Sequence, residues 1–254
     1  MALTPTRAAF FDVDNTLVRG STLYFLGRGM YQRGYFTKAD ISRFVVANLR
    51  FRMTGTEKKE VIDRFQKAAT DFVGGHQVSD ILKLGEEIYD EYVSPKLWER
   101  TCEIAREHLT RGEDVWLVTA APQDMANIIA QRLGLTGAIG SKVIIKDGIY
   151  TGELDGKLLH GTEKAVAIQN LAEERGYKLE DCASYSDSHN DVPLLTAVGH
   201  PSAINPDALL RIKALAEGWP IHDFRRARYL NRLLGPAVSR LAAVATLLVP
   251  RKRR

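Results

Sequence analysis

The sequence predicts an α/β protein: a Rossmann-like parallel sheet core with an inserted helical cap domain. Short apolar runs that end in polar residues alternate with helical patterns, which is typical of βαβ units. About 100 residues separate the first two predicted strands, too many for a simple crossover. The composition of the 254 residues, 45% hydrophobic and 26% charged, excludes a disordered or fibrous chain.

Two apolar runs and a weaker third are predicted to form the parallel strands. Residues 8–11 lead into Asp12, residues 115–119 end at Thr119, and residues 183–186 precede Asp187. Buried parallel strands read as short continuous apolar runs because both faces of the sheet are covered. Ligands bind beyond the carboxyl ends of such strands, so we expect the polar residues there to meet.

The helices predicted after these strands each close at a glycine, which readily adopts the left-handed conformation that ends a helix. They cover residues 122–133, 162–175, 191–198 and 206–217. One pair of segments breaks the alternation. Residues 142–145 and 149–152 flank Asp147-Gly148, a dipeptide typical of tight hairpins, and predict a small antiparallel edge element.

The insertion after the first strand is predicted to be helical, with helices over residues 38–53, 57–72 and 78–92. A further helix over residues 95–109 has Ser94 as its N-cap and Pro95 at its first position. It serves as the crossover to the second strand. The core domain is therefore predicted to comprise residues 1–19 and 94–224, and the helical cap residues 20–93.

The net charge of +4 hides an asymmetry between body and tail. Of the 35 Lys and Arg, nine lie in residues 225–254, which hold no acid, leaving 26 against 31 acidic residues elsewhere. This basic amphipathic tail encloses an apolar stretch, residues 233–249, which is shorter than the roughly 20 residues of a membrane span. An interfacial membrane helix and a terminal helix packed on the body explain it equally well. We expect no nucleic acid partner, because the tail has few aromatic residues and nothing in the sequence resembles a known nucleic-acid-binding fold.

Nothing at the N-terminus resembles a secretory signal, since the apolar run before Asp12 is only four residues long. Two cysteines, Cys102 and Cys182, are too few for a disulfide framework or a zinc cluster. We therefore expect a cytoplasmic protein, with peripheral membrane contact through residues 225–254 as the open alternative.

Two carboxylates stand two residues apart at the end of the first predicted strand. Asp12 and Asp14, in the sequence DVDNT that ends at Thr16, can share a metal site and divide the roles of nucleophile and general acid/base. Taken alone, a pair of turn or capping aspartates explains the same residues.

Three further motifs follow in order. Thr119 offers a hydroxyl where a helix begins, a place that binds anions. Lys164 lies in the first turn of a predicted helix, the unfavourable end of the dipole for a cation, and a neighbouring anion would explain it. Asp187 and Asp191 offer carboxylate oxygens to a hard cation such as Mg²⁺. Each has a simpler explanation as a cap, a surface lysine or an acidic turn, but their order along the strand ends indicates one site.

In this order the motifs resemble those of the haloacid-dehalogenase-like (HAD) phosphohydrolase superfamily, over about residues 8–222. The helical insertion and residues 184–221 resemble its subfamily IB, which includes phosphoserine phosphatases. The matching residues are Asp12, Asp14 and Thr16 for the first motif, Thr119 for the second, Lys164 for the third, and Asp187 and Asp191 for the fourth.

The resemblance implies a Mg²⁺-dependent phosphomonoesterase in which Asp12 attacks phosphorus and forms an aspartyl-phosphate. Asp14 would protonate the leaving group and then activate water. Mg²⁺ would be held by the Asp12 carboxylate, the Asp14 backbone carbonyl and Asp187. Thr16, Thr119 and Lys164 would bind the phosphoryl group, and Asp191 would orient Lys164 or a metal-bound water.

Substrate identity is expected to depend on the cap. Phosphoserine phosphatases carry a glutamate shortly after the first motif that meets the substrate ammonium, whereas residues 17–22 hold no acid here, and Arg19 stands near that place. A small, phosphoserine-like phosphorylated metabolite is the leading expectation. Histidinol phosphate and, at a membrane surface, a glycerol or lysolipid phosphate are alternatives. A phosphomutase and a non-catalytic phosphate-binding scaffold stay open, and the sequence does not predict the oligomeric state.

Overall fold

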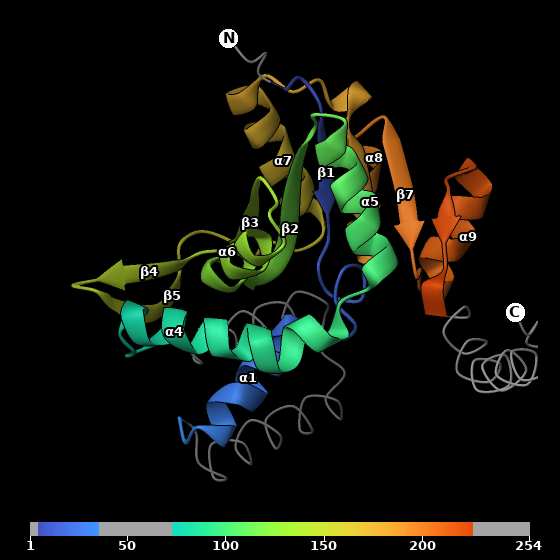
Figure 1. Ribbon diagram of the computed structural model, residues 1–254. Helices are drawn as coiled ribbons and strands as arrows, with labels where there is room; N and C mark the ends of the chain where they lie inside the picture. Colours follow the sequence, from blue (N-terminus) through green and yellow to red (C-terminus); the bar gives the residue numbers. More distant parts are fainter. Residues whose placement is uncertain (1–4, 36–72, 226–254) are drawn as a thin grey trace, which may run out of the picture.

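A computed structural model describes residues 5–35 and 73–225, which form a parallel sheet flanked by helices (Figure 1). The six-stranded sheet has the order β3-β2-β1-β6-β7-β8, and every adjacent pair is parallel. The expected Rossmann-like fold is confirmed. The strands are β1 (Ala8–Phe11), β2 (Asp114–Pro122), β3 (Gly137–Ser141), β6 (Ala183–Ser186), β7 (His200–Ile204) and β8 (Ile221–His222).

The strand order places a switch point between β1 and β6. From β1 the chain moves outward through β2 to β3, then returns to β6 on the other side of β1. Connections leave the sheet in opposite directions at this point, which opens a crevice at the carboxyl ends of the two strands. Asp12 and Asp187 directly follow these two ends.

Alternate residues of β1 supply the two sides of the core, as the pleat of a strand requires. Phe11 joins an apolar cluster that includes Cys102 and Ala105 of α5 (Glu99–Thr110). Phe10 joins a second cluster with Ile168 and Leu194. The helices that contribute to the two sides are α5, α6 (Gln123–Arg132), α7 (Thr162–Arg175) and α8 (Val192–Thr196), and α9 (Ala208–Glu217) contacts β7.

Helices α1 (Thr22–Gln32) and α4 (Val78–Ile88) lie together beyond the carboxyl edge of the sheet (Figure 1). The helix predicted over residues 78–92 is confirmed as α4 and a wider, π-helical turn, Tyr89–Val93. Both helices belong to the same apolar cluster as Phe11. The helices predicted over residues 38–53 and 57–72, and the tail beyond Arg225, fall outside the described residues.

The predicted start of the helix over residues 95–109 is wrong. Ser94–Lys96 form a single 3₁₀ turn, and α5 begins only at Glu99. Between them Leu97 is extended and pairs with Val18, while the Trp98 N–H donates to the Leu17 carbonyl at 2.8 Å. This pairing with the loop after β1 holds the chain extended, so a helix cannot run on from Pro95.

The predicted hairpin is confirmed as a separate two-stranded antiparallel sheet of β4 (Val143–Lys146) and β5 (Ile149–Leu154). Asp147 and Gly148 have φ of 51° and 77°, the positive values that a tight hairpin turn needs.

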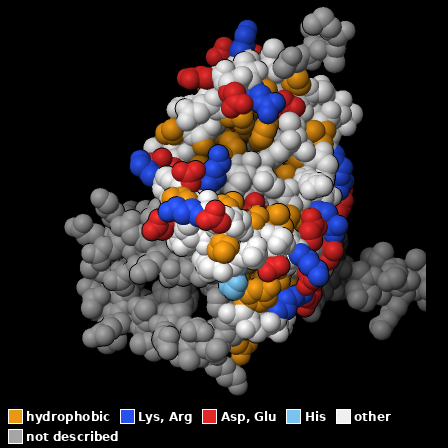
Figure 2. All heavy atoms as spheres, turned by 90° about the vertical axis from the view of Figure 1, so that its left-hand side faces the viewer, with side chains coloured by type: hydrophobic (Ala, Val, Ile, Leu, Met, Phe, Trp, Pro, Cys, Tyr) orange, Lys and Arg blue, Asp and Glu red, His pale blue; other side chains and the backbone are white. Residues whose placement is uncertain are grey.

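Figure 2, which looks onto the side of the molecule that carries the β4–β5 hairpin, shows acidic and basic side chains interspersed over the described surface. Among the described helices, none has the length and apolar character to cross a bilayer.

Candidate active site

The register of the sheet delivers Asp12 to the centre of its carboxyl edge. Phe11 is level with Leu117 of β2 and Tyr185 of β6. The Asp12 N–H continues this pairing by donating to the Tyr185 carbonyl at 2.9 Å. The carboxyl group of Asp12 therefore starts at the switch point, with Thr119 on one neighbouring strand and Asp187 just beyond the other.

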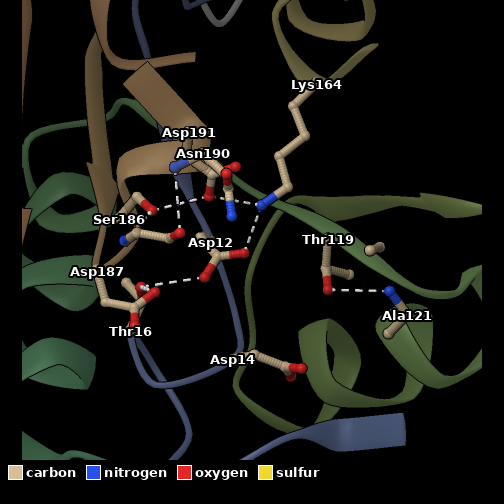
Figure 3. A network of polar contacts seen from close by, with 12 residues as sticks. Asp12, Asp14, Thr16, Thr119, Ala121, Lys164, Ser186, Asp187, Asn190 and Asp191 are labelled. Atoms are coloured by element: carbon tan, nitrogen blue, oxygen red, sulfur yellow. Dashed lines mark hydrogen bonds and ion pairs between the residues drawn. The ribbon is translucent and has the colours of Figure 1, made fainter. Parts of the chain in front are cut away.

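Lys164 bridges two of the predicted carboxylates (Figure 3). Its Nζ lies 2.6 Å from Oδ1 of Asp12 and 2.7 Å from Oδ2 of Asp191. The Lys164 side chain is only 4% exposed. An ammonium at the start of α7 is opposed by burial and by the helix dipole. The two carboxylates outweigh both and raise the pKa of Lys164 above its ordinary value.

Asp191 serves to hold Lys164 in place. Its Oδ2 accepts hydrogen bonds from Lys164 and from Ser186 Oγ, the latter at 2.8 Å. Asp191 stands directly before α8, yet its side chain makes no capping hydrogen bond to that helix. The side chain of Asp191 therefore does not cap α8, because its carboxylate turns toward the buried ammonium.

Asp12 and Asp187 approach each other across Thr16. Thr16 Oγ1 lies 3.1 Å from Oδ2 of Asp12 and 3.5 Å from Oδ1 of Asp187. Burial raises the pKa of Asp12 although Lys164 opposes the shift, and burial together with the charge of Asp12 raises the pKa of Asp187 to about 8. Burial thus disfavours the charged forms of both carboxylates, and Lys164 alone does not offset it.

The two carboxylates fit a hard divalent cation. Among residues 5–35 and 73–225, no three His, Cys, Asp or Glu side chains gather as a metal-binding group, so side chains alone do not complete a cage. Mg²⁺ binds through one or two carboxylates and keeps several waters. Asp12 and Asp187 supply two such carboxylates, and the Asp14 backbone carbonyl is the further ligand that the family resemblance implies. A cation there would favour the charged forms of the two carboxylates, whose pKa values burial raises.

The side chain of Asp14 is engaged elsewhere. Its Oδ1 accepts hydrogen bonds from the backbone N–H and hydroxyl of Thr22, at 2.9 and 2.7 Å. Asn15, with φ of 57°, turns the chain after Asp14, and its backbone and side chain bond to Gly20. This compact loop brings Thr22 back to Asp14. The Asp14 carboxyl group points away from Asp12, as Figure 3 shows.

Thr119 completes the site from the end of β2. It is buried, and its Oγ1 accepts a hydrogen bond from the Ala121 N–H at 3.2 Å. Figure 3 shows it on the other side of Asp12 from Asp187. Thr119, Asp12 and Asp187 all face a cavity of about 250 Å³. It is lined by Asp12, Asp14, Thr119, Lys164, Asp187 and Asp191, so all predicted site residues except Thr16 border it directly.

Three of the residues around the predicted groups were not themselves predicted. Ser186 orients Asp191, Thr22 holds Asp14, and His160 lines the cavity just before α7. Ser186 ends a predicted strand directly before Asp187, a position that could have indicated its role. Thr22 and His160 reach the site because of how the loops before α1 and α7 fold. No comparable signal in the sequence indicates their roles.

The fold and the site together place a buried aspartate, paired with a lysine, at the switch point of a Rossmann-like sheet. The chain belongs to the haloacid dehalogenase-like hydrolase family, whose sequence model matches residues 9–196. That range contains every predicted site residue. The comparisons also confirm the expected enzyme class, a phosphatase of this family.

Phosphoserine phosphatase SerB1 of Mycobacterium tuberculosis is 48% identical over 248 residues, covering 95% of this chain and 80% of that protein. A protein of unknown function from Bordetella pertussis has a solved structure that is similar with a TM-score of 0.75 and 29% identity, covering 87% and 99% of the two chains. A substrate-bound phosphoserine phosphatase is similar in fold with a TM-score of 0.60 and 22% identity, covering 89% and 97%.

Proposed function

We propose that the protein is a Mg²⁺-dependent phosphomonoesterase that acts on a small, phosphoserine-like phosphorylated metabolite through an aspartyl-phosphate. The observation that carries the proposal is the position of Asp12, which lies between Lys164 and Asp187 at the wall of a cavity of about 250 Å³. A carboxylate can approach a phosphate dianion only where positive charge offsets the repulsion.

In the first step an Asp12 carboxylate oxygen forms a bond to phosphorus while the ester oxygen–phosphorus bond breaks. The leaving oxygen takes a proton from Asp14, whose carboxyl group is held through Oδ1 by Thr22. In the second step water attacks phosphorus, Asp14 takes a proton from it, and the Asp12–phosphate bond breaks to release inorganic phosphate. Lys164 and Thr119 hold the phosphoryl oxygens in line. Bound Mg²⁺ would neutralise phosphoryl charge as a Lewis acid.

The substrate class rests on the size and lining of the cavity and on the named relative. Ser21, Thr22 and Leu23 form the wall contributed by the start of α1, where a phosphoserine phosphatase would carry its glutamate. Asp14 is the only acid that residues 13–23 contribute to the lining. Phosphoserine, histidinol phosphate and glycerol 3-phosphate therefore belong in one panel, together with lysophosphatidate.

The test measures inorganic phosphate released from this panel and from an aryl phosphate, with Mg²⁺ or with a chelator. We expect Mg²⁺-dependent release by the wild type, none by Asp12→Asn, and unchanged release by Asp155→Asn, an exposed aspartate outside the site. Transfer of phosphate to a second sugar or alcohol instead of water would indicate a phosphomutase. No release from any ester, with Asp12→Asn and the wild type alike, would contradict the proposal.

A further inference from the structure

Helix α9 carries large apolar side chains on two opposite faces. Leu210 and Ala214 are buried in a cluster with Ala203 of β7. Leu209, Ile212 and Leu215 are 60%, 65% and 68% exposed. Since an α-helix turns about 100° per residue, Ile212 points away from the buried face, with Leu209 and Leu215 on either side of it. Single exposed apolar residues are ordinary, but three on one stripe form a contiguous surface.

Basic side chains border this stripe, defined as Leu209, Ile212 and Leu215. Arg211 and Lys213 project on its two sides, where they pair with Asp223 and Glu217. None of the stripe residues lines the catalytic cavity. The surface therefore has no part in the proposed chemistry, and its function has to be sought in contact with another surface.

The described chain ends beside α9. The guanidinium of Arg225 donates to the Pro206 carbonyl, just before α9, at 3.0 Å. The sequence that continues from this point, residues 226–254, contains eight Lys or Arg and no acid, with basic residues on both sides of the apolar stretch 233–249. The apolar stripe on α9 thus lies where the described chain ends, and the sequence that follows is strongly basic.

We propose that the α9 stripe is a docking surface for an anionic lipid bilayer. The bilayer interface takes up apolar side chains at the acyl boundary and attracts basic residues to its headgroups. A second copy of the chain would bring the same basic segment with it. Residues 226–254 folded back on α9 would find the carboxylates beside the stripe, Asp223 and Glu217, already paired with Arg211 and Lys213. The combination of stripe and charge favours the membrane.

The test uses the full-length protein and co-sedimentation with vesicles of phosphatidylcholine, with or without phosphatidylglycerol. We expect binding to the anionic vesicles only, weakened by salt. Leu209→Gln, Ile212→Gln and Leu215→Gln together should weaken it about tenfold or more. A matched variant with Ile145→Gln and Val166→Gln, exposed apolar residues on β4 and α7, should bind as the wild type does. Neutralising residues 251–254 to Gln should also weaken binding.

The other occupants give different results. A lower unfolding midpoint of the stripe variant with unchanged vesicle binding would mean that the chain's own tail covers α9. A smaller oligomer of the stripe variant in lipid-free solution would mean a second copy. Either result, or absence of wild-type binding to anionic vesicles, would overturn the proposal. Phosphate release from a soluble ester should be equal in all these variants, which separates this test from that of the proposed function.

Discussion

Lys164 is the residue on which the charge balance of the site depends. It is buried between Asp12 and Asp191, within 2.7 Å of each. Loss of one partner from a buried ion pair leaves uncompensated charge and typically lowers stability by about 3–5 kcal/mol. We therefore expect Lys164→Met to lower the free energy of unfolding in urea by roughly this amount, and to abolish phosphate release.

A surface lysine with similar pairing geometry supplies the control. Lys157 lies 2.7 Å from Glu163, but its side chain is 76% exposed. Exposed pairs add little to stability because water solvates both charges, so Lys157→Met should unfold at nearly the wild-type urea concentration. Equal effects of the two substitutions would contradict the account of Lys164 as a buried counter-charge.

His108 is expected to make stability depend on pH. It is buried on α5, with Nε2 2.8 Å from the Tyr185 hydroxyl and with Glu113 and Arg111 at Nδ1. Burial lowers its pKa below the ordinary value, although Glu113 opposes this. Below about pH 6.5 the unfolded chain therefore binds a proton that the folded chain resists. Stability should be fully present above that pH and fall as the pH drops through this range.

The measurement is the free energy of unfolding across this pH range for the wild type and His108→Gln. The variant should show a shallower loss toward acid, and the exposed His200→Gln should behave as the wild type does. Burial also lowers the pKa of His160, so part of the slope should remain in His108→Gln. An identical slope in all three proteins would contradict this interpretation of His108.

The residues of the site divide into those the sequence predicts and those it does not. Asp12, Thr119 and Asp187 could be placed because each follows a short apolar run, and the ends of parallel strands converge. The partner of Asp14 could not, because Thr22 reaches it only through the turn at Asn15. Sequence spacing predicts what a strand carries to an edge, but not how a loop folds back on it.

At the scale of elements, the same distinction separates correct predictions from errors. The helix 162–175 has the predicted bounds because its closing glycine, Gly176, is a local signal. The strand 183–186 (ASYS) is only weakly apolar, but the polar motif that begins at Asp187 marks its end. Strands β3 (GAIGS) and β7 (HPSAI) were missed because glycine, proline and serine interrupt their apolar residues. Their neighbours in the sheet supply the pairing that propensity does not.

The contact between α4 and α6 depends on the absence of a side chain at Gly85. A Cβ at this position would lie 2.6 Å from Cδ1 of Ile128. Gly85→Ala gains up to about 1 kcal/mol of helix propensity, but overpacking a core contact costs about 1–3 kcal/mol. We expect a net decrease in the free energy of unfolding.

Ile128→Val tests this contact because it removes the methyl group that the new Cβ would meet. The double variant Gly85→Ala/Ile128→Val should be more stable than the sum of the single effects predicts, since the two sites are coupled. Ile168→Val, in the other apolar cluster, should add to Gly85→Ala without coupling. If the effects of Gly85→Ala and Ile128→Val on the free energy of unfolding were additive, the new Cβ and Cδ1 of Ile128 would not clash. Helices α4 and α6 would then have moved apart to make room for the Cβ.

At the scale of the whole molecule, the described helices beyond the sheet edge share its core. Phe11 of β1, Leu26 of α1 and Leu84 of α4 belong to one continuous apolar cluster with Met125 of α6. Helices α1 and α4 belong to the segment proposed as the cap, residues 20–93, but their apolar side chains pack into the core of the sheet. Elements joined by a common core open together.

This packing predicts that α4 unfolds with the sheet. Native-state hydrogen exchange at increasing denaturant should give amides of α4 and amides of β1 the same opening free energy, to within about 1 kcal/mol. The Lys157→Met variant should leave this agreement unchanged, whereas Gly85→Ala should lower the value for α4 and β1 alike. If α4 instead exchanged through an opening several kcal/mol less costly than that of β1, α1 and α4 would form an independently stable unit, and the shared cluster would contribute little to holding them on the sheet.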